Sequence, residues 1–352
     1  MKVLSVVGAR PQFVKLAPIV RASRDSSISH VTVHTGQHYD AAMSEVFFEE
    51  LGIGEPEWNL GVGSGKHGEQ TGAMLKGLEE LFIGEQPDWV LIYGDTNSTL
   101  AAALAAVKLH LPVAHLEAGL RSFNRRMPEE HNRILSDHAS DLLLAPTEQA
   151  AEQLAVEGLK DRTVVVGDVM VDILLDIANS SENALPETVS ELLEGKEYIL
   201  ATIHRAENTD DFQRLSEVIS ALSELPLPVV FPVHPRVKDK VRETTISLEQ
   251  GSLVPIEPLS YQQMVATIQQ AKSVVTDSGG LQKEAAVLGK PVTTLRTETE
   301  WTETLEDNRN VLAADLIGIN EIVMRSVPST SNWAPYGEGK AAEKVIEVLL
   351  GR

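Results

Sequence analysis

The sequence contains no cysteine, no long apolar run and no excess of positive charge. Without cysteine, disulfide bonds, thiolate metal sites and cysteine nucleophiles are excluded. No stretch of about 18 apolar residues is present, which argues against a membrane-spanning helix. Because Met1–Gly8 has the pattern of a strand rather than of a secretion signal, we expect a cytoplasmic protein.

Basic residues are few relative to acidic ones: 30 Lys and Arg stand against 51 Asp and Glu, a formal net charge of −21. Such a field repels polyanions at long range, so we expect neither nucleic acid nor an anionic membrane as a partner. A small anionic substrate remains compatible with this charge if basic residues gather at its site.

Several cofactor motifs are also missing. No Gly-x-Gly-x-x-Gly follows a predicted strand, which argues against a nicotinamide cofactor. Gly61–Lys66 resembles a phosphate loop, but its first glycine is missing and His67 stands where Ser or Thr should bind magnesium. No His-Glu-x-x-His occurs, so we expect neither a cofactor nor a metal site.

Short β-branched runs alternate with helical patterns along the whole chain. Strands of four to six residues separated by helices predict parallel sheets with right-handed crossovers. The predicted strands are Lys2–Val7, Val31–Thr35, Trp89–Tyr93, Pro112–Leu116, Leu142–Ala145, Val164–Val166, Tyr198–Thr202, Val229–Val233, Leu253–Ile256, Ser273–Thr276 and Val292–Leu295.

The length predicts about two domains. We expect an α/β protein with two Rossmann-like, doubly wound domains, 1–170 and 171–352, facing a cleft lined by the carboxyl ends of the strands. The weakly periodic segment Asn179–Lys196 lies near the boundary. The final helical stretch, Gly339–Leu350, can pack on either domain.

Adjacent glycines, Gly279 and Gly280, follow Ser278 where an apolar run ends and a helical pattern begins. Glycine lets bare backbone approach a ligand, and a helix N-terminus offers unpaired N–H groups to an anion. Glu284, one turn into that helix, can accept hydrogen bonds from hydroxyls attached to the anion. The pattern predicts a site for a phosphate beside a sugar, although an isolated Gly-Gly can also simply turn the chain.

Charged residues follow other predicted strands. Arg10 and Lys15 come after the first strand and can both reach a phosphate, while Asp95 lies in a turn after Trp89–Tyr93. Alternation places His115 and Glu117 on one face of their strand.

A predicted helix from Met127 carries Glu129, Arg133 and Asp137 at i, i+4, i+8 spacing, for which a solvated ion-pair stripe is the alternative. His204 and Arg205 end a strand in the second half, and His234 has a similar but weaker setting one strand later.

With these residues identified, the chain resembles the non-hydrolysing UDP-N-acetylglucosamine 2-epimerases over nearly its full length. The resemblance rests on six ordered motifs: Gly8–Pro11, Gly94–Thr96, His115–Arg121, Pro128–Arg133, His204–Asn208 and Thr276–Glu284. It implies the glycosyltransferase-B arrangement, usually as a homodimer, and interconversion of UDP-GlcNAc and UDP-ManNAc.

The resemblance also implies roles for individual residues. Arg10, Lys15 and His204 would face the substrate phosphates, Ser278–Gly280 the diphosphate and Glu284 the ribose hydroxyls. Arg133 is implied as a further substrate-binding residue. Asp95, Glu117 and Glu129 would work at the sugar, with His204 also counted among the catalytic residues.

The residues suit this chemistry. Carbon 2 of the sugar is not adjacent to a carbonyl, so its proton is too weakly acidic for direct removal by a carboxylate. Without a redox cofactor, the proton can leave together with UDP from carbon 1, which needs a carboxylate base and electrostatic stabilisation of the departing diphosphate. Re-addition of UDP to the glycal, with the proton delivered to the opposite face, completes the inversion.

The chain departs from the common family pattern in three places. The loop Ser122–Met127 is two residues shorter, Tyr39 replaces an arginine in a region used for allosteric activation, and Trp301 replaces an arginine near the diphosphate. Trp301 and the Ser122 loop resemble relatives that epimerise UDP-2,3-diacetamido-2,3-dideoxyglucuronate, so that sugar is an alternative substrate. The short loop resembles archaeal UDP-GlcNAc enzymes as well and does not decide between the two sugars. A glycosyltransferase and a non-catalytic nucleotide-sugar-binding protein are the remoter alternatives.

Overall fold

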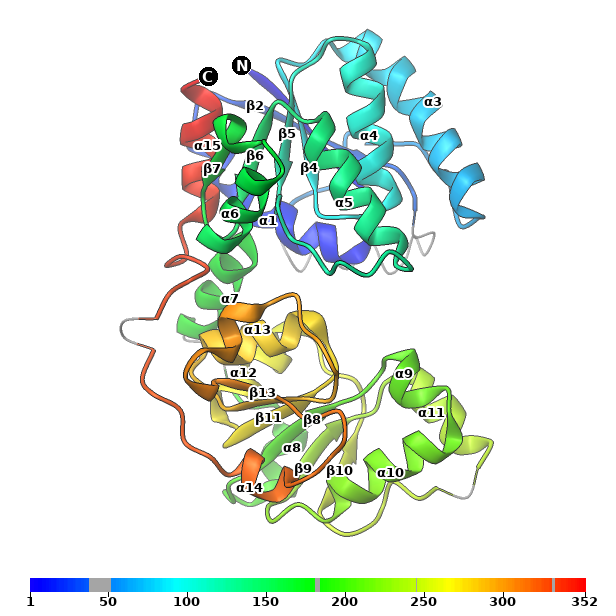
Figure 1. The fold of residues 1–352 in the computed structure, drawn as a ribbon, viewed down its shortest axis with the longest axis vertical. Coiled ribbons are helices and arrows are strands. Elements are labelled where there is room, and N and C mark those ends of the chain that lie inside the picture. Colours follow the sequence, from blue (N-terminus) through cyan, green and yellow to red (C-terminus); the bar gives the residue numbers. More distant parts are fainter. Residues whose placement is uncertain (38–51, 181–183, 245, 331–332) are drawn as a thin grey trace. The chain divides into compact units, whose positions relative to one another are not determined.

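The computed structural model describes residues 1–37, 52–180, 184–244, 246–330 and 333–352. These residues form two compact units, one of Met1–Ile173 with Pro335–Arg352 and one of Leu174–Ala334. Each unit contains one parallel sheet between helices (Figure 1). The predicted α/β class with two doubly wound domains is therefore confirmed.

The first unit has the strand order β3-β2-β1-β4-β5-β6-β7, with every neighbouring pair parallel. The strands are β1 (Lys2–Val7), β2 (Ser29–His34), β3 (Trp58–Asn59), β4 (Trp89–Tyr93), β5 (Val113–Leu116), β6 (Leu142–Ala145) and β7 (Thr163–Val165). The helices are α1 (Arg10–Arg24), α3 (His67–Glu85), α4 (Asn97–Lys108), α5 (Pro128–Ala139), α6 (Glu148–Val156), the 3₁₀ turn η1 (Lys160–Arg162) and α15 (Ala341–Leu350), while α7 (Val169–Asn179) begins in this unit.

The core of the first unit explains its layers. Helix α3 buries Met74, Leu78 and Phe82 at i, i+4, i+8 spacing, and these side chains pack with the alanine-rich α4 against Leu4, Val6, Val90 and Ile92 of the central strands. Strands in a doubly wound sheet are covered on both faces, which is why they read as continuous apolar runs. The connection from β1 to β2 and the connection from β4 to β5 run in opposite directions along the sheet. Because both crossovers are right-handed, α1 and α4 lie on opposite faces of the sheet.

The second unit has the strand order β10-β9-β8-β11-β12-β13, again all parallel. Its strands are β8 (Ile199–Thr202), β9 (Val229–Pro232), β10 (Leu253–Ile256), β11 (Ser273–Thr276), β12 (Val292–Thr294) and β13 (Asn310–Leu312). Its helices are α8 (Glu187–Leu193), α9 (Ala206–Thr209), α10 (Phe212–Ser223), α11 (Pro235–Arg242), α12 (Tyr261–Gln270), α13 (Gly279–Val287), η2 (Thr302–Asn308) and α14 (Ile319–Val323).

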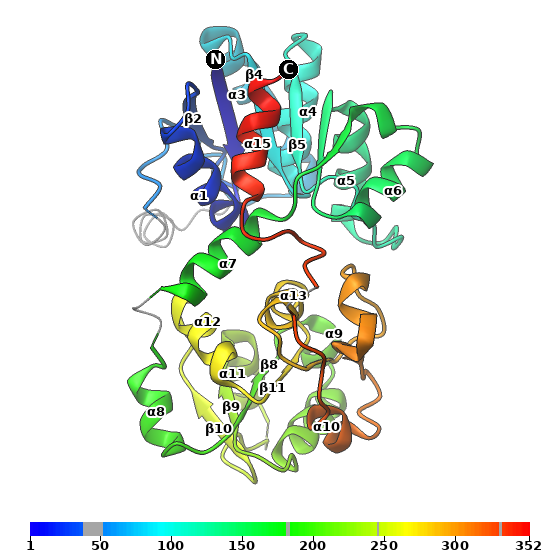
Figure 2. The ribbon, with the colours of Figure 1, turned by 90° about the vertical axis from the view of Figure 1, so that its left-hand side faces the viewer.

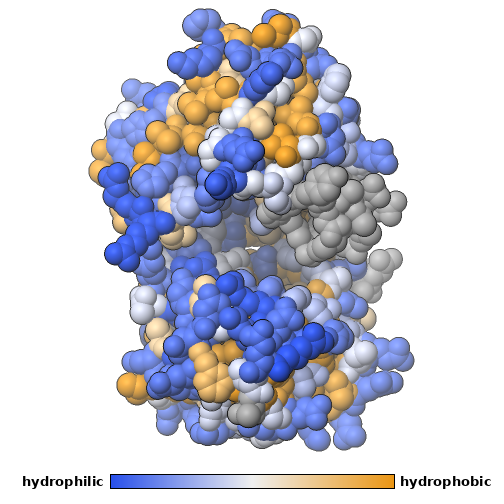
Figure 3. All heavy atoms as spheres, turned by 90° about the vertical axis from the view of Figure 1, so that its right-hand side faces the viewer, coloured by the Kyte–Doolittle hydropathy of each residue, from blue (hydrophilic) through white to orange (hydrophobic). Residues whose placement is uncertain are grey.

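Two apolar clusters hold this second sheet between its helices. Helix α10 buries Leu215, Val218, Ile219 and Leu222 against β8 and β9, and α12 and α13 pack on the opposite face. The outward side of α10 is polar, and the face of this unit that carries α10 and α11 is mostly hydrophilic in Figure 3. This amphipathic pattern is typical of helices at a protein surface.

The eleven predicted strands all occur, within one or two residues at their ends. Two short strands were not predicted. β3 has only Trp58 and Asn59, both exposed, and β13 is three residues long. Neither has the alternation or the apolar run by which a strand is recognised.

The first unit is built from two separate stretches of the chain. Helix α15 lies beside α1 (Figure 2), and its first backbone N–H groups, those of Ala341 and Ala342, donate to the Asp172 carboxylate at 3.0 and 2.7 Å. A carboxylate at a helix N-terminus satisfies donors that have no partner inside the helix. Asp172 thus caps a helix about 170 residues further along the chain.

Candidate functional site

Each sheet reverses its winding direction once, at β1/β4 in the first unit and at β8/β11 in the second. Ligands of doubly wound sheets bind beyond the carboxyl ends of the strands at such points. The predicted residues follow these strands or their neighbours. We call Lys15, Asp95, Glu117, Glu130 and Arg133 the carboxylate cluster, and His204, Arg205, Asp277, Ser278 and Gly279 the glycine-helix cluster.

In the carboxylate cluster, Lys15 forms an ion pair with Glu117. Both side chains are about 15% exposed, at 14% and 15%. Burial would lower the pKa of Lys15, but the Glu117 and Asp95 carboxylates raise it above the usual lysine value, so Lys15 is a cation. Lys15 was expected at the phosphates; in this structure it is paired with a predicted catalytic carboxylate.

The backbone of Glu117 has an unusual conformation. Its φ is +70°, a left-handed conformation that is uncommon for a residue other than glycine. The turn is fixed because the N–H groups of Glu117 and Ala118 both donate to the Leu144 carbonyl, at 3.1 and 3.2 Å. The carboxylate is therefore held at the end of β5 by backbone bonds to β6.

Arg133 joins the two other carboxylates of the cluster. Its guanidinium lies 2.5 Å from Asp95 Oδ2 and 3.1 Å from Glu130 Oε2. Burial opposes the charge, but Asp95 and Glu117 raise the pKa of Arg133. The solvated ion-pair stripe considered for α5 is wrong, because Arg133 turns toward the β4 turn and Asp137 is fully buried.

Adjacent residues of α5 have opposite environments. Glu129, the predicted catalytic residue, is exposed. Glu130 is 1% exposed and accepts hydrogen bonds at 2.9 Å from Ser122 N, Ser122 Oγ and Phe123 N. Burial would raise the pKa of Glu130, but the Ser122 donors hold it below the usual value. Sequence reasoning did not assign Glu130 this role of anchoring the short Ser122–Met127 loop.

A buried network, which we call the His115 network, lies behind the cluster. His115 is 0% exposed, with Nε2 2.7 Å from the Gly94 carbonyl oxygen and Nδ1 2.7 Å from Asp137 Oδ1. Asp137 Oδ2 contacts Arg121 at 2.7 Å, and Arg121 also forms two 2.8 Å hydrogen bonds with Glu157. Burial would raise the pKa of Asp137, but His115 and Arg121 hold it below its usual value.

The first residues of α1 complete this side of the unit. Gly8 N and Ala9 N donate to Gln12 Oε1 at 2.8 and 3.0 Å, so a side chain of the first turn reaches back to the backbone that leads into the helix. Arg10 is the first residue of α1, but its side chain lies outside what the structure describes. Tyr39, at the predicted activator region, also lies outside the described residues.

The glycine-helix cluster is organised by Asp277, which is 0% exposed. Its oxygens accept from His204 N at 3.1 Å, Arg205 N at 3.0 Å and Asn208 Nδ2 at 3.2 Å, and lie 3.1 Å from His204 Nδ1. Burial would raise the pKa of Asp277, but these contacts hold it below the usual value. His204 keeps a side chain that is 38% exposed.

His234 is the weaker histidine candidate. Its ring centroid lies 5.4 Å from that of His204, and Nδ1 accepts from Arg236 N at 3.1 Å, which caps α11. Burial and the neighbouring His204 lower the pKa of His234.

Helix α13 starts directly after Ser278, whose hydroxyl accepts from Leu281 N at 3.4 Å. A Cβ on Gly279 would lie 2.4 Å from Glu300 Oε1, so a side chain there would displace the Glu300 carboxylate, whereas Gly280 is exposed. Glu284 is 6% exposed and its Oε1 accepts from the Tyr261 hydroxyl at 3.1 Å.

Trp301 is 5% exposed, and the ammonium of Lys283 lies 4.0 Å from the centre of its ring. Lys283 is itself 3% exposed and belongs to α13. The indole that stands in place of the family's arginine thus makes a cation–π contact with a buried lysine of α13.

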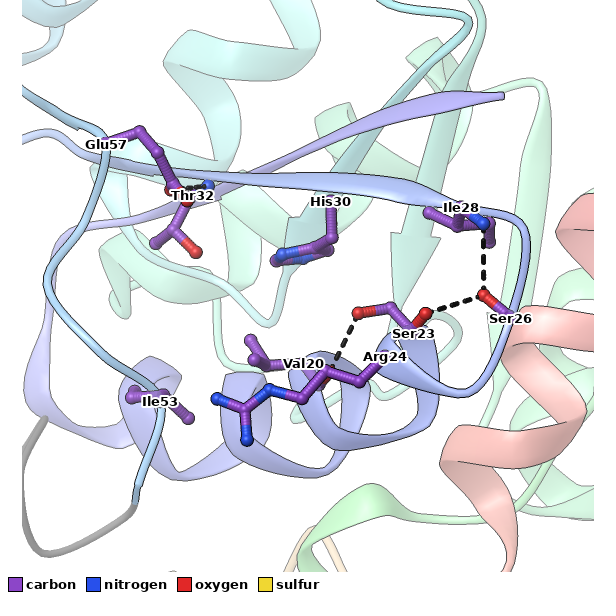
Figure 4. Close-up of a pocket in the computed structure, with 9 residues that line it drawn as sticks. All are labelled: Val20, Ser23, Arg24, Ser26, Ile28, His30, Thr32, Ile53 and Glu57. Atoms are coloured by element: carbon purple, nitrogen blue, oxygen red, sulfur yellow. Dashed lines mark hydrogen bonds between the residues drawn. The ribbon is translucent and has the colours of Figure 1, made fainter.

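Other features of the described residues lie apart from these clusters. A cavity of about 280 Å³ lies between the end of α1 and the start of β2, lined by residues that include Arg24, His30 and Glu57 (Figure 4). It contains none of the predicted site residues. Among the described residues, no three His, Asp or Glu side chains gather as a metal site, and no helix is long and apolar enough to cross a membrane.

Known proteins resemble the chain along its whole length. The sequence model of the UDP-N-acetylglucosamine 2-epimerase family matches residues 21–350. A UDP-N-acetylglucosamine 2-epimerase homolog of Methanococcus maripaludis is 46% identical over 99% of both chains, and the UDP-2,3-diacetamido-2,3-dideoxy-D-glucuronate 2-epimerase of Pseudomonas aeruginosa is 45% identical over the same shares.

A solved structure resembles the fold as closely. The crystal structure of Methanocaldococcus jannaschii UDP-GlcNAc 2-epimerase in complex with UDP-GlcNAc and UDP covers 100% of both chains at 40% identity, with a TM-score of 0.86. With matches of this extent in both sequence and fold, the chain belongs to the UDP-N-acetylglucosamine 2-epimerase family.

Proposed function

We propose that the protein is an isomerase, a 2-epimerase that interconverts UDP-GlcNAc and UDP-ManNAc by elimination and re-addition of UDP. The observation that carries this proposal is the carboxylate cluster, in which Glu117 is paired with Lys15 and Asp95 with Arg133 at the β1/β4 reversal. Within a chain of this family, it offers two ion-paired carboxylates for proton transfer, and general acid–base catalysis of this kind contributes typically ~10²–10⁴-fold.

The Lys15–Glu117 ion pair occupies both groups. We infer that the substrate diphosphate draws Lys15 toward itself, which opens this pair and leaves the Glu117 carboxylate available to contact the sugar. Asp95, held by Arg133, and the exposed Glu129 are proposed to act at the sugar as the other proton-transfer groups.

The glycine-helix cluster suits the departing diphosphate. Ser278, Gly279 and Gly280 begin α13, whose first N–H groups and dipole favour an anion. His204, Arg205 and, by the family resemblance, Arg10 would add positive charge or hydrogen bonds to the phosphates as negative charge grows on them. Glu284 is proposed to accept hydrogen bonds from the ribose hydroxyls.

A second sugar is favoured by one specific observation. The Lys283–Trp301 pair places an indole and a buried cation next to the diphosphate-binding helix. A diacetamido uronic acid carries an acetamido methyl and a carboxylate that such a pair could contact. We therefore propose UDP-2,3-diacetamido-2,3-dideoxyglucuronate as the alternative substrate, with UDP-GlcNAc as the first.

Incubation of the protein with UDP-GlcNAc alone in deuterated water tests the proposal. We expect UDP-ManNAc to form with deuterium at carbon 2, because the proton removed exchanges with solvent before it returns. Binding without exchange would indicate a non-catalytic nucleotide-sugar-binding protein, and transfer only after an acceptor is added would indicate a glycosyltransferase. Running UDP-GlcNAc and the diacetamido uronate in competition identifies the preferred sugar.

The assembly and location follow from the family resemblance alone. We propose a cytoplasmic homodimer. Light scattering of the purified protein tests the first part, where the mass of a single 38.3 kDa chain would contradict it. Cell fractionation tests the second.

A further inference from the structure

The His115 network occupies the interior directly behind the carboxylate cluster. The hydrogen-bond partners in this network indicate which atoms donate and which accept. The Gly94 carbonyl oxygen can only accept, so Nε2 of His115 donates to it. Asp137 accepts from the Arg121 guanidinium and from Gly119 N at 3.2 Å, which favours its charged form, so Nδ1 of His115 also donates.

Both ring nitrogens of His115 thus face oxygen acceptors, the Gly94 carbonyl and the Asp137 carboxylate. Arg121 in turn pairs with two carboxylates, those of Asp137 and Glu157. Each has its partner within 2.8 Å. Buried ionic groups are tolerated only when they are paired in this way.

Three segments that carry the carboxylate cluster meet in this network. The Gly94 carbonyl belongs to the turn of Asp95, Gly119 N belongs to the turn of Glu117, and Asp137 lies one turn after Arg133 on α5. His115 and Asp137 contact all three. Glu157, in contrast, bonds to Arg121 and to Gln153 of α6, and it meets the last turn of α5 through the exposed ring of His138 at 3.3 Å.

We propose that His115 and Asp137 are positioning residues of the epimerase: their paired hydrogen bonds set the spacing of the two turns and α5, and thereby of Asp95, Glu117 and Arg133. The inference rests on the proposed function. A purely structural role would instead make the pair matter for stability alone, as any buried ion pair does.

The test compares the wild type with three full-length variants. Asp137→Asn keeps the shape but leaves one acceptor oxygen for Arg121, Gly119 N and His115 Nδ1, so at least one of these three groups faces the amide NH₂ instead of a carboxylate oxygen. Glu157→Gln is the matched control, because it weakens the same arginine from the other side. In the double variant His115→Gln/Asp137→Asn, an amide at each position can bond its neighbour, so donors and acceptors match again without charge.

For each protein we would measure kcat and KM for epimerisation, the UDP dissociation constant and Tm. A 1 Å displacement of a catalytic group costs on the order of 10²-fold, so Asp137→Asn should lower kcat by about that factor with KM and UDP affinity nearly unchanged. Glu157→Gln should retain wild-type kcat despite a lower Tm. The double variant should regain a large part of the lost kcat.

Equal kcat in Asp137→Asn and Glu157→Gln would overturn the proposal, as would a folded double variant with no recovery. If Asp137→Asn does not fold, the double variant is compared with Glu157→Gln. A similar loss of kcat in these two variants would overturn the proposal. A wild type without epimerase activity on UDP-GlcNAc or the diacetamido uronate would refute the proposed function itself, and this inference with it.

Discussion

Replacing Asp277 with asparagine tests how the second unit holds the His204–Asn208 loop, which we propose faces the substrate. Four donor atoms surround this buried carboxylate: the backbone N–H groups of His204 and Arg205, Asn208 Nδ2 and His204 Nδ1. An amide offers one acceptor oxygen and one NH₂ group, which would face donors. Hydrogen bonds to a charged group contribute about 1.5–3 kcal/mol each, so the loss of one or two predicts a destabilisation of about 3 kcal/mol.

In a unit of this size, about 1 kcal/mol shifts Tm by roughly 2–4 °C, so Asp277→Asn should lower the melting temperature of the second unit by about 6–12 °C. The effect depends on pH in a defined direction. The pKa of Asp277 is held below its ordinary value of 3.8, so its contribution is complete above that value and is lost as the pH falls through the lower, folded-state pKa. The difference in Tm between wild type and variant should therefore shrink in acid.

Calorimetry between pH 7 and pH 3 measures this difference, with Asp210→Asn as the control. Asp210 is an exposed carboxylate 3.2 Å from Arg236, and exposed pairs contribute only about 0–1 kcal/mol. Because Asp277 fixes the His204 loop, UDP affinity should fall about tenfold, or 1.4 kcal/mol, in Asp277→Asn. A Tm equal to that of Asp210→Asn, or a difference that does not change with pH, would refute the reasoning.

Asp95→Asn and Glu117→Gln should each reduce turnover by about 10²–10⁴-fold while UDP binding, measured by titration calorimetry, persists; near-normal activity in both would contradict the elimination mechanism. Gly8→Ala should destabilise the first unit by about 1–3 kcal/mol, because its Cβ would lie 2.1 Å from Thr35 Oγ1 and 2.2 Å from Ser98 Oγ, and an unchanged denaturation midpoint would disprove this. Trp301→Arg should shift the preference in a two-sugar competition toward UDP-GlcNAc, and a preference for UDP-GlcNAc that the change leaves undisturbed would end the uronic-acid alternative.

The fold could be predicted in most of its detail because buried parallel strands have a distinct local pattern. Lys2–Val7 and Ser273–Thr276 were predicted with their observed ends, since each is an apolar or β-branched run bounded by turn residues. β3 could not be predicted, because its two exposed residues are ordered by pairing with Val33 and His34 and not by any local preference.

The sequence predicted that the candidate residues follow strand ends, but not which residues they contact. Strand ends indicated Asp95, Glu117 and His204, since the carboxyl edge of a parallel sheet collects such residues. Which cation meets which anion depends on segments far apart in sequence. Lys15 was expected to meet a phosphate but pairs with Glu117, about a hundred residues away.

Asp277 shows the same difference between position and role. Its place in the Thr276–Gly280 motif was clear, but its role as the acceptor for the His204 loop depends on the neighbouring strands β8 and β11. A sequence motif identifies such a residue but does not predict its contacts.

The way in which Asp172 caps α15 has a consequence for biosynthesis. The ribosome synthesises Pro335–Arg352 only after all of the second unit. Until then, the first unit cannot be completed, and the surface of α1 that α15 covers is exposed. The second unit is contiguous and can fold during that interval. While the second unit is being made, the first half of the nascent chain therefore lacks both α15 and the backbone N–H groups that α15 donates to Asp172.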